Sequence, residues 1–214
     1  MSETPRQMSL GAFLMATGHH VAAWRHPDVP ANAGLDIHHY RHLARVAEGA
    51  LFDALFVADS VAAPEGEIAS RMARSDHFEP LTLLSALSGV TERIGLVATA
   101  TTTYNEPYHV ARKFASLDHL SGGRAGWNLV TSDAAAEALN FGLEEHVGHA
   151  KRYVRAREFH EVVMGLWDSW ADDAFVRDKK SCTYYKPDSV RLLNHKGEHF
   201  NAVSYTHLSC RRRG

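Results

Sequence analysis

Residues 93–132 read RIGLVATATTTYNEPYHVARKFASLDHLSGGRAGWNLVTS, and this stretch decides the predicted fold class. Apolar residues at 94–100 predict a strand that ends in a run of threonines. Pro107 suits the first turn of a helix, and two glycines at 122–123 end that helix. Residues 125–130 predict a second buried strand, which completes one βαβ unit of a parallel sheet. In such sheets functional groups gather at the carboxyl ends of the strands.

Apolar residues recur at helical spacing between the strands, which predicts helices that pack one face against the sheet. Asp36 suits the N-cap of the first long helix, and Pro80 suits the first turn of the next. A short helix is predicted at 134–140 and a longer one at 150–170. The inward positions predicted on the long helices are Tyr40, Leu43, Ala47 and Leu51; Leu84 and Leu87; Val110, Phe114, Leu117 and Leu120; and Tyr153, Ala156, Phe159, Val163 and Leu166.

The other strands are predicted at 8–15 and 53–58, so strand and helix alternate along the chain. The central positions of the strands are Phe13, Phe56, Val97 and Trp127. Two loops, 17–34 and 61–79, are long for connections inside a domain, and such loops are usually functional. No GxGxxG motif follows the first strand, which argues against a Rossmann fold. The α/β pattern of four βα units instead fits half of an eight-stranded barrel.

The composition argues against several classes of protein. The 214-residue chain has a formal net charge of −2, which gives no electrostatic sign of nucleic-acid binding. No apolar run approaches the length of a transmembrane helix, and the N-terminus lacks the pattern of a signal peptide. The two cysteines, Cys182 and Cys210, do not form a disulfide framework. We therefore expect a cytoplasmic protein that binds neither membranes nor nucleic acids.

The sequence contains no self-sufficient catalytic group. There is no GxSxG motif, and neither cysteine has an obvious catalytic partner. His38 and His42 are four residues apart and could bind zinc, but no HExxH motif accompanies them. A solvated helix face is the better interpretation, so we expect no metal site. These features favour an enzyme in which a bound cofactor supplies the chemistry.

Several motifs together point to a known family. They are TTYNEPYHVARKFASLDHLSGGRAGWNLVTS at 102–132, FDALFVAD at 52–59, WRHP at 24–27, HAKRY at 149–153 and NHKGEHF at 194–200. In these motifs the chain resembles the flavin-dependent monooxygenases related to nitrilotriacetate monooxygenase, a branch of the bacterial luciferase-like superfamily. The resemblance covers roughly residues 8–201 and implies the (β/α)8 TIM-barrel fold.

The resemblance ends abruptly near the C-terminus. After Asn201 the family pattern should continue into the second half of the barrel, but the chain reads AVSYTHLSCRRRG and stops. We expect residues 1–202 to be an N-terminal half-barrel with about four βα units. We expect residues 203–214 to be a non-native tail that packs against nothing specific, because VSYTHL is similar to translated sequencing-adapter DNA. The alternative is a genuine basic tail that contacts anionic partners.

The resemblance implies contacts with FMN at the strand ends and at the start of the last long helix. The implied FMN-binding residues are Asp59, Thr99, Thr101, Ser132, Asp133, His149 and Tyr153. Asn128 is a polar residue inside a buried strand and needs a partner, for which the flavin is one candidate. His19 or His20, in the first long loop, is the candidate catalytic group near the flavin or the substrate. Arg152 and Arg155 could assist with negative charge, but a solvated position is the better interpretation.

Some of these residues have plainer interpretations, since Asp59 could cap a loop and Thr99 is a common strand former. The resemblance implies a two-component monooxygenase, in which a separate flavin reductase supplies reduced FMN and O₂ is used to oxygenate a small organic substrate. It also implies a homo-oligomer for the full-length protein. Two alternatives stay open: an inert half-barrel that only binds flavin, and a deazaflavin-dependent oxidoreductase of the same superfamily.

Overall fold

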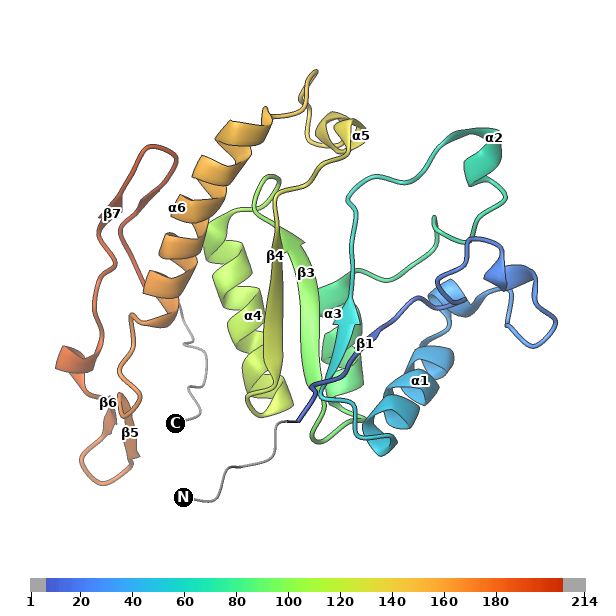
Figure 1. Ribbon diagram of the computed structural model, residues 1–214. Coiled ribbons are helices and arrows are strands. Elements are labelled where there is room, and N and C mark those ends of the chain that lie inside the picture. Colours follow the sequence, from blue (N-terminus) through green and yellow to red (C-terminus); the bar gives the residue numbers. More distant parts are fainter. Residues whose placement is uncertain (1–6, 206–214) are drawn as a thin grey trace.

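The protein contains one parallel sheet whose strands follow each other in chain order (Figure 1). The computed structural model describes residues 7–205 of the 214-residue chain. The strands are β1 (Gly11–Phe13), β2 (Ala54–Val57), β3 (Gly95–Thr101) and β4 (Ala125–Val130). All neighbouring strands are parallel, and a helix lies between each strand and the next. This arrangement confirms the predicted succession of βα units.

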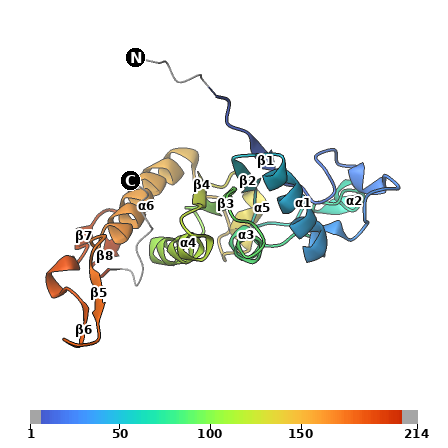
Figure 2. The ribbon, with the colours of Figure 1, turned by 90° about the horizontal axis from the view of Figure 1, so that it is seen from below.

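Helices join the strands and lie around one face of the sheet. The long helices are α1 (Ile37–Gly49), α3 (Pro80–Ser88), α4 (Pro107–Ser121) and α6 (His149–Trp167), and the short ones are α2 (Gly66–Ala69) and α5 (Ala135–Leu139). Short 3-10 helices occur at Ala23–Arg25, Ala33–Leu35 and Pro187–Ser189. Seen from below, the long helices form an arc around the strands (Figure 2). An outer layer of helices of this kind is expected for a segment of a barrel.

The parallel register brings the strand ends to one edge of the sheet. Phe13 pairs with Phe56, and Phe56 pairs with Val97, as the spacing of these positions predicts. Trp127 is offset by one residue, because it pairs with Ala98. Each strand therefore delivers its last residues to the same edge, where the sequence places its polar groups.

Local signals set the helix ends as predicted. Asp36 caps α1, since its carboxylate accepts the backbone N–H of His38 at 2.8 Å. Pro80 and Pro107 occupy the first turns of α3 and α4. Gly122 ends α4 with a φ of 73°, in the left-handed region that glycine enters without strain. These signals fix the residues at which α1, α3 and α4 begin and the residue at which α4 ends.

The hydrophobic core lies between the sheet and the long helices. Leu96 of β3, Leu84 of α3, Phe114 of α4 and Phe159 of α6 are almost fully buried in one cluster. The ring of Trp127 on β4 packs against this cluster, with its centroid 5.7 Å from that of Phe114. This packing fixes β3 and β4 relative to α4 and α6.

Three residues predicted to face the core are exposed instead. Leu51, Leu120 and Tyr153 have relative exposures of 79%, 66% and 56%. Leu51 lies beyond the end of α1 with a φ of 63°, so helical spacing no longer applies to it. Leu120 and Tyr153 are rotated away from the buried stripes of their helices. The buried stripe of α6 runs through Arg152 and Ala156.

Two antiparallel ribbons follow α6. They pair β5 (Phe175–Asp178) with β6 (Thr183–Tyr185), and β7 (His195–Lys196) with β8 (Asn201–Ala202). Glu158 of α6 holds the β7–β8 ribbon. Its carboxylate accepts hydrogen bonds from the ring of His195 at 3.0 Å and from the backbone N–H groups of His199 and Phe200 at 2.9 and 2.8 Å.

The first three residues of the predicted tail make specific contacts. The carbonyl oxygen of Val203 accepts the N–H of Asn194 at 3.3 Å. The ring of Tyr205 packs edge-on against Trp170, with centroids 5.7 Å apart. The expectation that the tail packs against nothing is therefore wrong for these residues. Residues 206–214 lie outside the described part of the chain, and the non-native origin of the tail stays a prediction.

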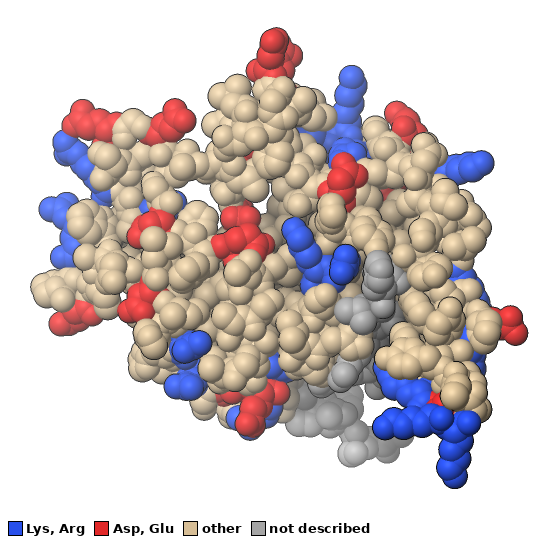
Figure 3. Space-filling view, turned by 180° about the vertical axis from the view of Figure 1, so that it is seen from behind, with Lys and Arg blue, Asp and Glu red and all other residues tan. Residues whose placement is uncertain are grey.

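The surface carries charges of both signs. On the face shown in Figure 3, Lys and Arg side chains are spread among Asp and Glu side chains, without a continuous basic stripe. Within residues 7–205, no helix is both long enough and apolar enough to cross a membrane. The same described residues contain no group of three or more His, Cys, Asp or Glu side chains placed to hold a metal ion.

Candidate functional site

A cavity of about 600 Å³ lies at the carboxyl ends of β3 and β4. Among the residues that line it are nearly all those for which the sequence predicts flavin contacts. They are Asp59 after β2, Thr99 and Thr101 on β3, Ser132 and Asp133 after β4, and His149 and Tyr153 at the start of α6. Because neighbouring strands are parallel, their carboxyl ends meet at one edge. The structure thus brings these residues around one space.

Asn128 is not among the described residues that line this cavity. Its Nδ2 donates a hydrogen bond of 3.0 Å to Oγ1 of Thr99, its neighbour on β3. The half-buried polar side chain on β4 therefore finds a partner within the protein, and β4 is half-buried along its length rather than buried as the sequence predicts. The Asn128 side chain orients the hydroxyl group of Thr99, which does line the cavity.

A second pair of hydroxyl groups lies where β3 and β4 end. Ser132 Oγ donates a hydrogen bond of 2.8 Å to Oγ1 of Thr101, which also accepts the N–H of Thr103 at 3.1 Å. Ser132 has a φ of 53°, a left-handed conformation that is uncommon for a residue with a Cβ atom. Backbone strain of this kind concentrates at functional sites. The strand ends therefore present fixed hydroxyl groups to the cavity.

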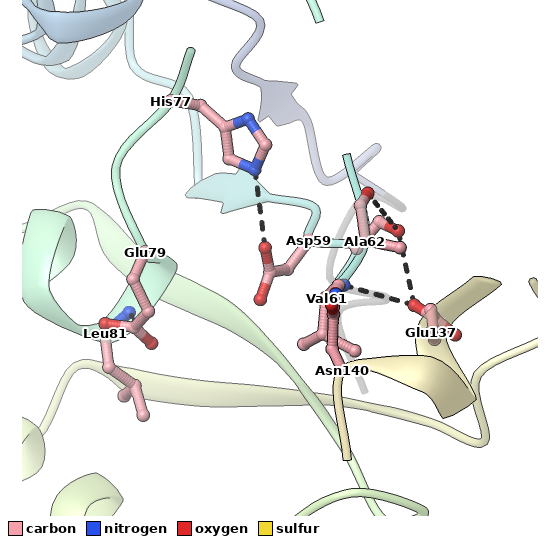
Figure 4. A network of polar contacts seen from close by, with 9 residues as sticks. Asp59, Val61, Ala62, His77, Glu79, Leu81, Glu137 and Asn140 are labelled. Carbon is pink, nitrogen blue, oxygen red and sulfur yellow. Dashed lines mark hydrogen bonds and ion pairs between the residues drawn. The ribbon is translucent and has the colours of Figure 1, made fainter. Parts of the chain in front are cut away.

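Asp59 forms an ion pair with the long loop that precedes α3 (Figure 4). Nε2 of His77 lies 3.6 Å from Oδ1 of Asp59, and the two side chains are 39% and 20% exposed. The contact with Asp59 raises the pKa of His77 by more than burial lowers it, and the charge of Asp76 adds to the rise. Sequence reasoning marked only the loop at 61–79 as functional and gave no signal for His77 itself.

Glu137 of α5 holds the segment that follows Asp59. Figure 4 shows its carboxylate beside this segment, where Oε1 accepts the hydroxyl of Ser60 at 3.2 Å and the N–H of Val61 at 3.1 Å. Asn140 also donates to the carbonyl of Val61, at 2.7 Å. Glu137 is only 4% exposed and lines the cavity. It was missed from the sequence, because nothing in a five-residue helix marks one glutamate as buried.

Arg152 is buried on the first turns of α6, although the sequence analysis expected it in solvent. It is 8% exposed and lines the cavity, and its Nη1 donates to the carbonyl of Val147 at 2.8 Å. The same expectation is wrong for Arg155, which is half-buried and lies over the ring of Phe200 at 4.4 Å. Helical spacing contains the missed signal, since Arg152 precedes the buried Ala156 by one turn.

His19 and His20 lie away from this cavity. Both are exposed, and neither is among the described residues that line it. Nε2 of His19 lies 2.9 Å from the carbonyl oxygen of Phe13, and Nδ1 of His20 accepts the N–H of Ala22 at 3.2 Å. Their catalytic role stays a prediction.

A second cavity, of about 550 Å³, adjoins the first. The two cavities share Asp59 and Ser60 in their walls. Most residues that line the second cavity are apolar, and they include Leu14, Val57 and Phe78. A polar space and a largely apolar space therefore meet at Asp59. This arrangement can hold a polar cofactor beside an organic molecule.

The residues around both cavities fall within one family match. Residues 12–212 match the family described as luciferase-like monooxygenase. The chain belongs to the luciferase-like monooxygenase family. The resemblance identified from the sequence motifs is therefore confirmed, and every residue that lines either cavity lies inside the matched segment.

Two curated relatives of this luciferase-like chain show how much of the family's length it contains. N-acetyl-S-(2-succino)cysteine monooxygenase of Bacillus subtilis (strain 168) is 52% identical over 201 residues, which cover 94% of the chain and 45% of the relative. Nitrilotriacetate monooxygenase component A of Aminobacter aminovorans is 48% identical over 204 residues, which cover 91% and 45%. The chain spans about half the length of the curated relatives it matches.

A solved structure has the same fold. A riboflavin lyase, determined with modified FMN and the substrate riboflavin, matches with a TM-score of 0.88 and 34% sequence identity. The match covers 95% of this chain and 47% of that structure. Together with the four-stranded parallel sheet, these matches confirm the predicted fold class, a luciferase-like TIM barrel of which this chain contains about half.

Proposed function

We propose that this chain is the N-terminal part of a two-component, FMN-dependent monooxygenase. A separate flavin reductase supplies reduced FMN, and the protein uses O₂ to oxygenate a small organic substrate. The observation that carries this proposal is the convergence of Asp59, the hydroxyl groups of β3, Ser132 and the first turns of α6 on one cavity. The adjoining apolar cavity is where the organic substrate would bind.

The polar cavity fits a flavin mononucleotide in size and chemistry. Its volume of about 600 Å³ falls within the range of roughly 300–1,000 Å³ that is typical of ligand pockets. Its lining contains hydroxyl, carboxylate and guanidinium side chains, such as those of Thr99, Asp59 and Arg152, and these suit a ligand that carries both hydrogen-bond donors and acceptors.

The residues of the chain have distinct tasks in this proposal. Bound reduced FMN would supply the electrons for oxygen activation. Asp59, Thr99 and Thr101 would hold its polar edges by hydrogen bonds, and Asn128 would keep the Thr99 hydroxyl oriented. The apolar walls of the second cavity would exclude water from the reacting atoms.

Two of the similar proteins support the cofactor and the partner. The name of the nitrilotriacetate enzyme, component A, supports a protein that works with a second component. The riboflavin lyase contains modified FMN, which supports a flavin in this fold. We extend the proposal to a cytoplasmic protein that is a homo-oligomer at full length and has no membrane or nucleic-acid partner. His19 or His20 is the proposed catalytic group.

The test uses the full reading frame recovered from the source DNA. FMN is reduced photochemically, mixed with the purified protein and then with O₂, and its reoxidation is followed by stopped-flow absorbance. We expect the protein to change the rate and spectral course of reoxidation relative to free reduced FMN. Bound flavin that reoxidises as free flavin does would favour the inert flavin-binding half-barrel. Turnover with reduced deazaflavin and without O₂ would favour the deazaflavin-dependent oxidoreductase.

A further inference from the structure

Two buried hydroxyl groups line the apolar cavity without a hydrogen-bond partner in the protein. Tyr40 of α1 and Thr17, in the loop after β1, are only 4% and 7% exposed, and both belong to the cavity wall. Neither hydroxyl forms a hydrogen bond with a residue that the structure describes. Neither oxygen is among the side-chain atoms of residues 7–205 that are both unpartnered and wholly inaccessible, so each keeps some accessible surface. Buried hydroxyl groups normally have a partner, and the cavity is where these two can find one.

The two hydroxyl groups belong to neighbouring parts of the wall. Nε2 of His39 lies 2.7 Å from the carbonyl oxygen of Ala16. These two residues directly precede Tyr40 and Thr17 in the chain, so the contact joins the two segments. The ring of Tyr40 also packs against Phe78, another residue of the wall, with centroids 5.8 Å apart. These contacts fix the part of the wall that carries the two hydroxyl groups.

The phenol of Tyr40 is a neutral hydrogen-bond donor. Burial raises its pKa above the ordinary value, and the negative charge of Asp76 raises it further. The phenol therefore keeps its proton at neutral pH and can donate it in a hydrogen bond. The hydroxyl group of Thr17 is also neutral and can donate as well. The wall thus offers two uncharged donors to a ligand.

The charges on the wall argue against an anionic ligand. Three carboxylates line the cavity, those of Asp59, Glu65 and Asp76. Arg74 is the sole Arg or Lys among the described residues of the wall, and its Nη2 already donates to the carbonyl of His19 at 2.6 Å. The remaining cationic group is His77, which is paired with Asp59. A bound anion would be repelled by the carboxylates, so a neutral ligand group is favoured.

We infer that Tyr40 and Thr17 are specificity-determining residues for an apolar substrate that carries a neutral oxygen acceptor of the carbonyl type. This inference rests on the proposed function, because it takes the apolar cavity as the substrate site. Water satisfies the polar groups of a ligand-free cavity, and a ligand that displaces this water must replace its hydrogen bonds. A pure hydrocarbon leaves both hydroxyl groups unpaired, so the cavity discriminates against it although most of the wall is apolar.

Three small probes test this inference with the purified chain. Acetophenone has a carbonyl group, ethylbenzene has a CH₂ group in its place, and benzoate carries a carboxylate on the same ring. Their affinities are measured by NMR titration in the absence of flavin. Tyr40→Phe and Thr17→Val should each weaken the binding of acetophenone about two- to tenfold without weakening that of ethylbenzene. Comparing variants cancels the difference in hydration between the two probes.

Matched measurements exclude general effects of the substitutions. Tyr184→Phe makes the same change at an exposed position of β6 and should leave all three affinities unchanged. If Tyr40→Phe does not fold, Thr17→Val should still shift the preference from acetophenone toward ethylbenzene. Benzoate should bind more weakly than acetophenone to the wild type, and the opposite order would overturn the inference by showing a site for anions.

Other outcomes separate this inference from the proposed function. Equal losses for acetophenone and ethylbenzene, or an unchanged affinity for acetophenone in both variants, would overturn the role of Tyr40 and Thr17. So would a wild type that binds none of the probes. In each case an altered reoxidation of FMN would leave the proposed function in place. If the probes behave as expected but the full-length protein leaves FMN reoxidation unchanged, the proposed function fails while the selectivity of the two hydroxyl groups stands.

Discussion

Replacing Glu158 by glutamine should loosen the β7–β8 ribbon from α6. The carboxylate of Glu158 is 12% exposed and accepts hydrogen bonds from His195, His199 and Phe200. Burial alone would raise its pKa, but these three donors lower the pKa from 4.5 to about 2. The ribbon is therefore attached through the charged form of the side chain.

The expected loss follows from this change of charge. A hydrogen bond to a charged group contributes roughly 1.5–3 kcal/mol, against about 0.5–1.5 kcal/mol for a neutral pair. Glutamine keeps one acceptor oxygen but turns an NH₂ group toward the remaining donors. Solvent near this surface ribbon screens part of the electrostatic effect, so we expect a loss of about 2 kcal/mol in the free energy of opening. That loss corresponds to roughly thirtyfold more frequent opening.

Amide hydrogen exchange measures this opening directly. The amides of His199 and Phe200 should exchange roughly thirtyfold faster in Glu158→Gln than in the wild type. Glu161→Gln, at an exposed position of the same helix, is the matched control and should leave exchange unchanged. Equal exchange rates in the two variants would show that the carboxylate does not hold the ribbon.

The same contact makes the ribbon sensitive to acid. Because the pKa of Glu158 is lowered from 4.5 to about 2, its stabilising contribution is fully present above about pH 5 and decreases as the pH falls toward 2. Amide protection of His199 and Phe200 should therefore fall over this range in the wild type. In Glu158→Gln the protection of these amides should depend much less on pH.

Four further predictions concern the site, a cap, a buried charge and the sheet edges. In the full-length protein, Asp59→Ala and Tyr153→Phe should each weaken the binding of reduced FMN about two- to tenfold, because each removes a hydrogen bond. Stopped-flow measurements give the affinity, and an unchanged affinity in both variants would remove these residues from the site. Gly122→Ala should lower the free energy of unfolding by about 1 kcal/mol in urea, because its φ is 73°, and an unchanged midpoint would contradict this. Arg124→Met should lower the free energy of unfolding by about 3–5 kcal/mol or prevent folding, since the buried guanidinium donates several hydrogen bonds. A decrease in the free energy of unfolding of less than about 1 kcal/mol would refute this prediction. The purified chain should self-associate in analytical ultracentrifugation through the open edges of β1 and β4, whereas a monomer that unfolds cooperatively would argue against this.

The helix ends were predictable where a single residue acts on the backbone directly and the tertiary structure does not override it. Pro107 and Gly122 bound α4 in the structure as they do in the sequence, because both act through backbone conformation alone. One error arose because an apolar spacing along the sequence does not show where its helix ends. Leu51 continues the apolar spacing of α1 but lies beyond the end of that helix.

The sequence predicted the site residues at the strand ends but missed the residues that hold them in place. Asp59 and Ser132 were identified through the family resemblance, and the structure brings them together because the carboxyl ends of parallel strands meet at one edge. His77 and Glu137 reach the same place from a long loop and a short helix. Their positions result from tertiary packing, for which no spacing along the chain gives a signal.

Arg152 differs from these two residues, because the sequence did contain a signal for it. It precedes Ala156 by four residues and Phe159 by seven, so it occupies the buried stripe of α6. A charged residue in such a stripe breaks the pattern that the rest of the helix obeys, and departures of this kind are expected at functional sites. The structure places this arginine in the lining of the polar cavity. A charged residue in a buried apolar stripe is therefore a signal for a candidate site, in addition to the strand-end motifs.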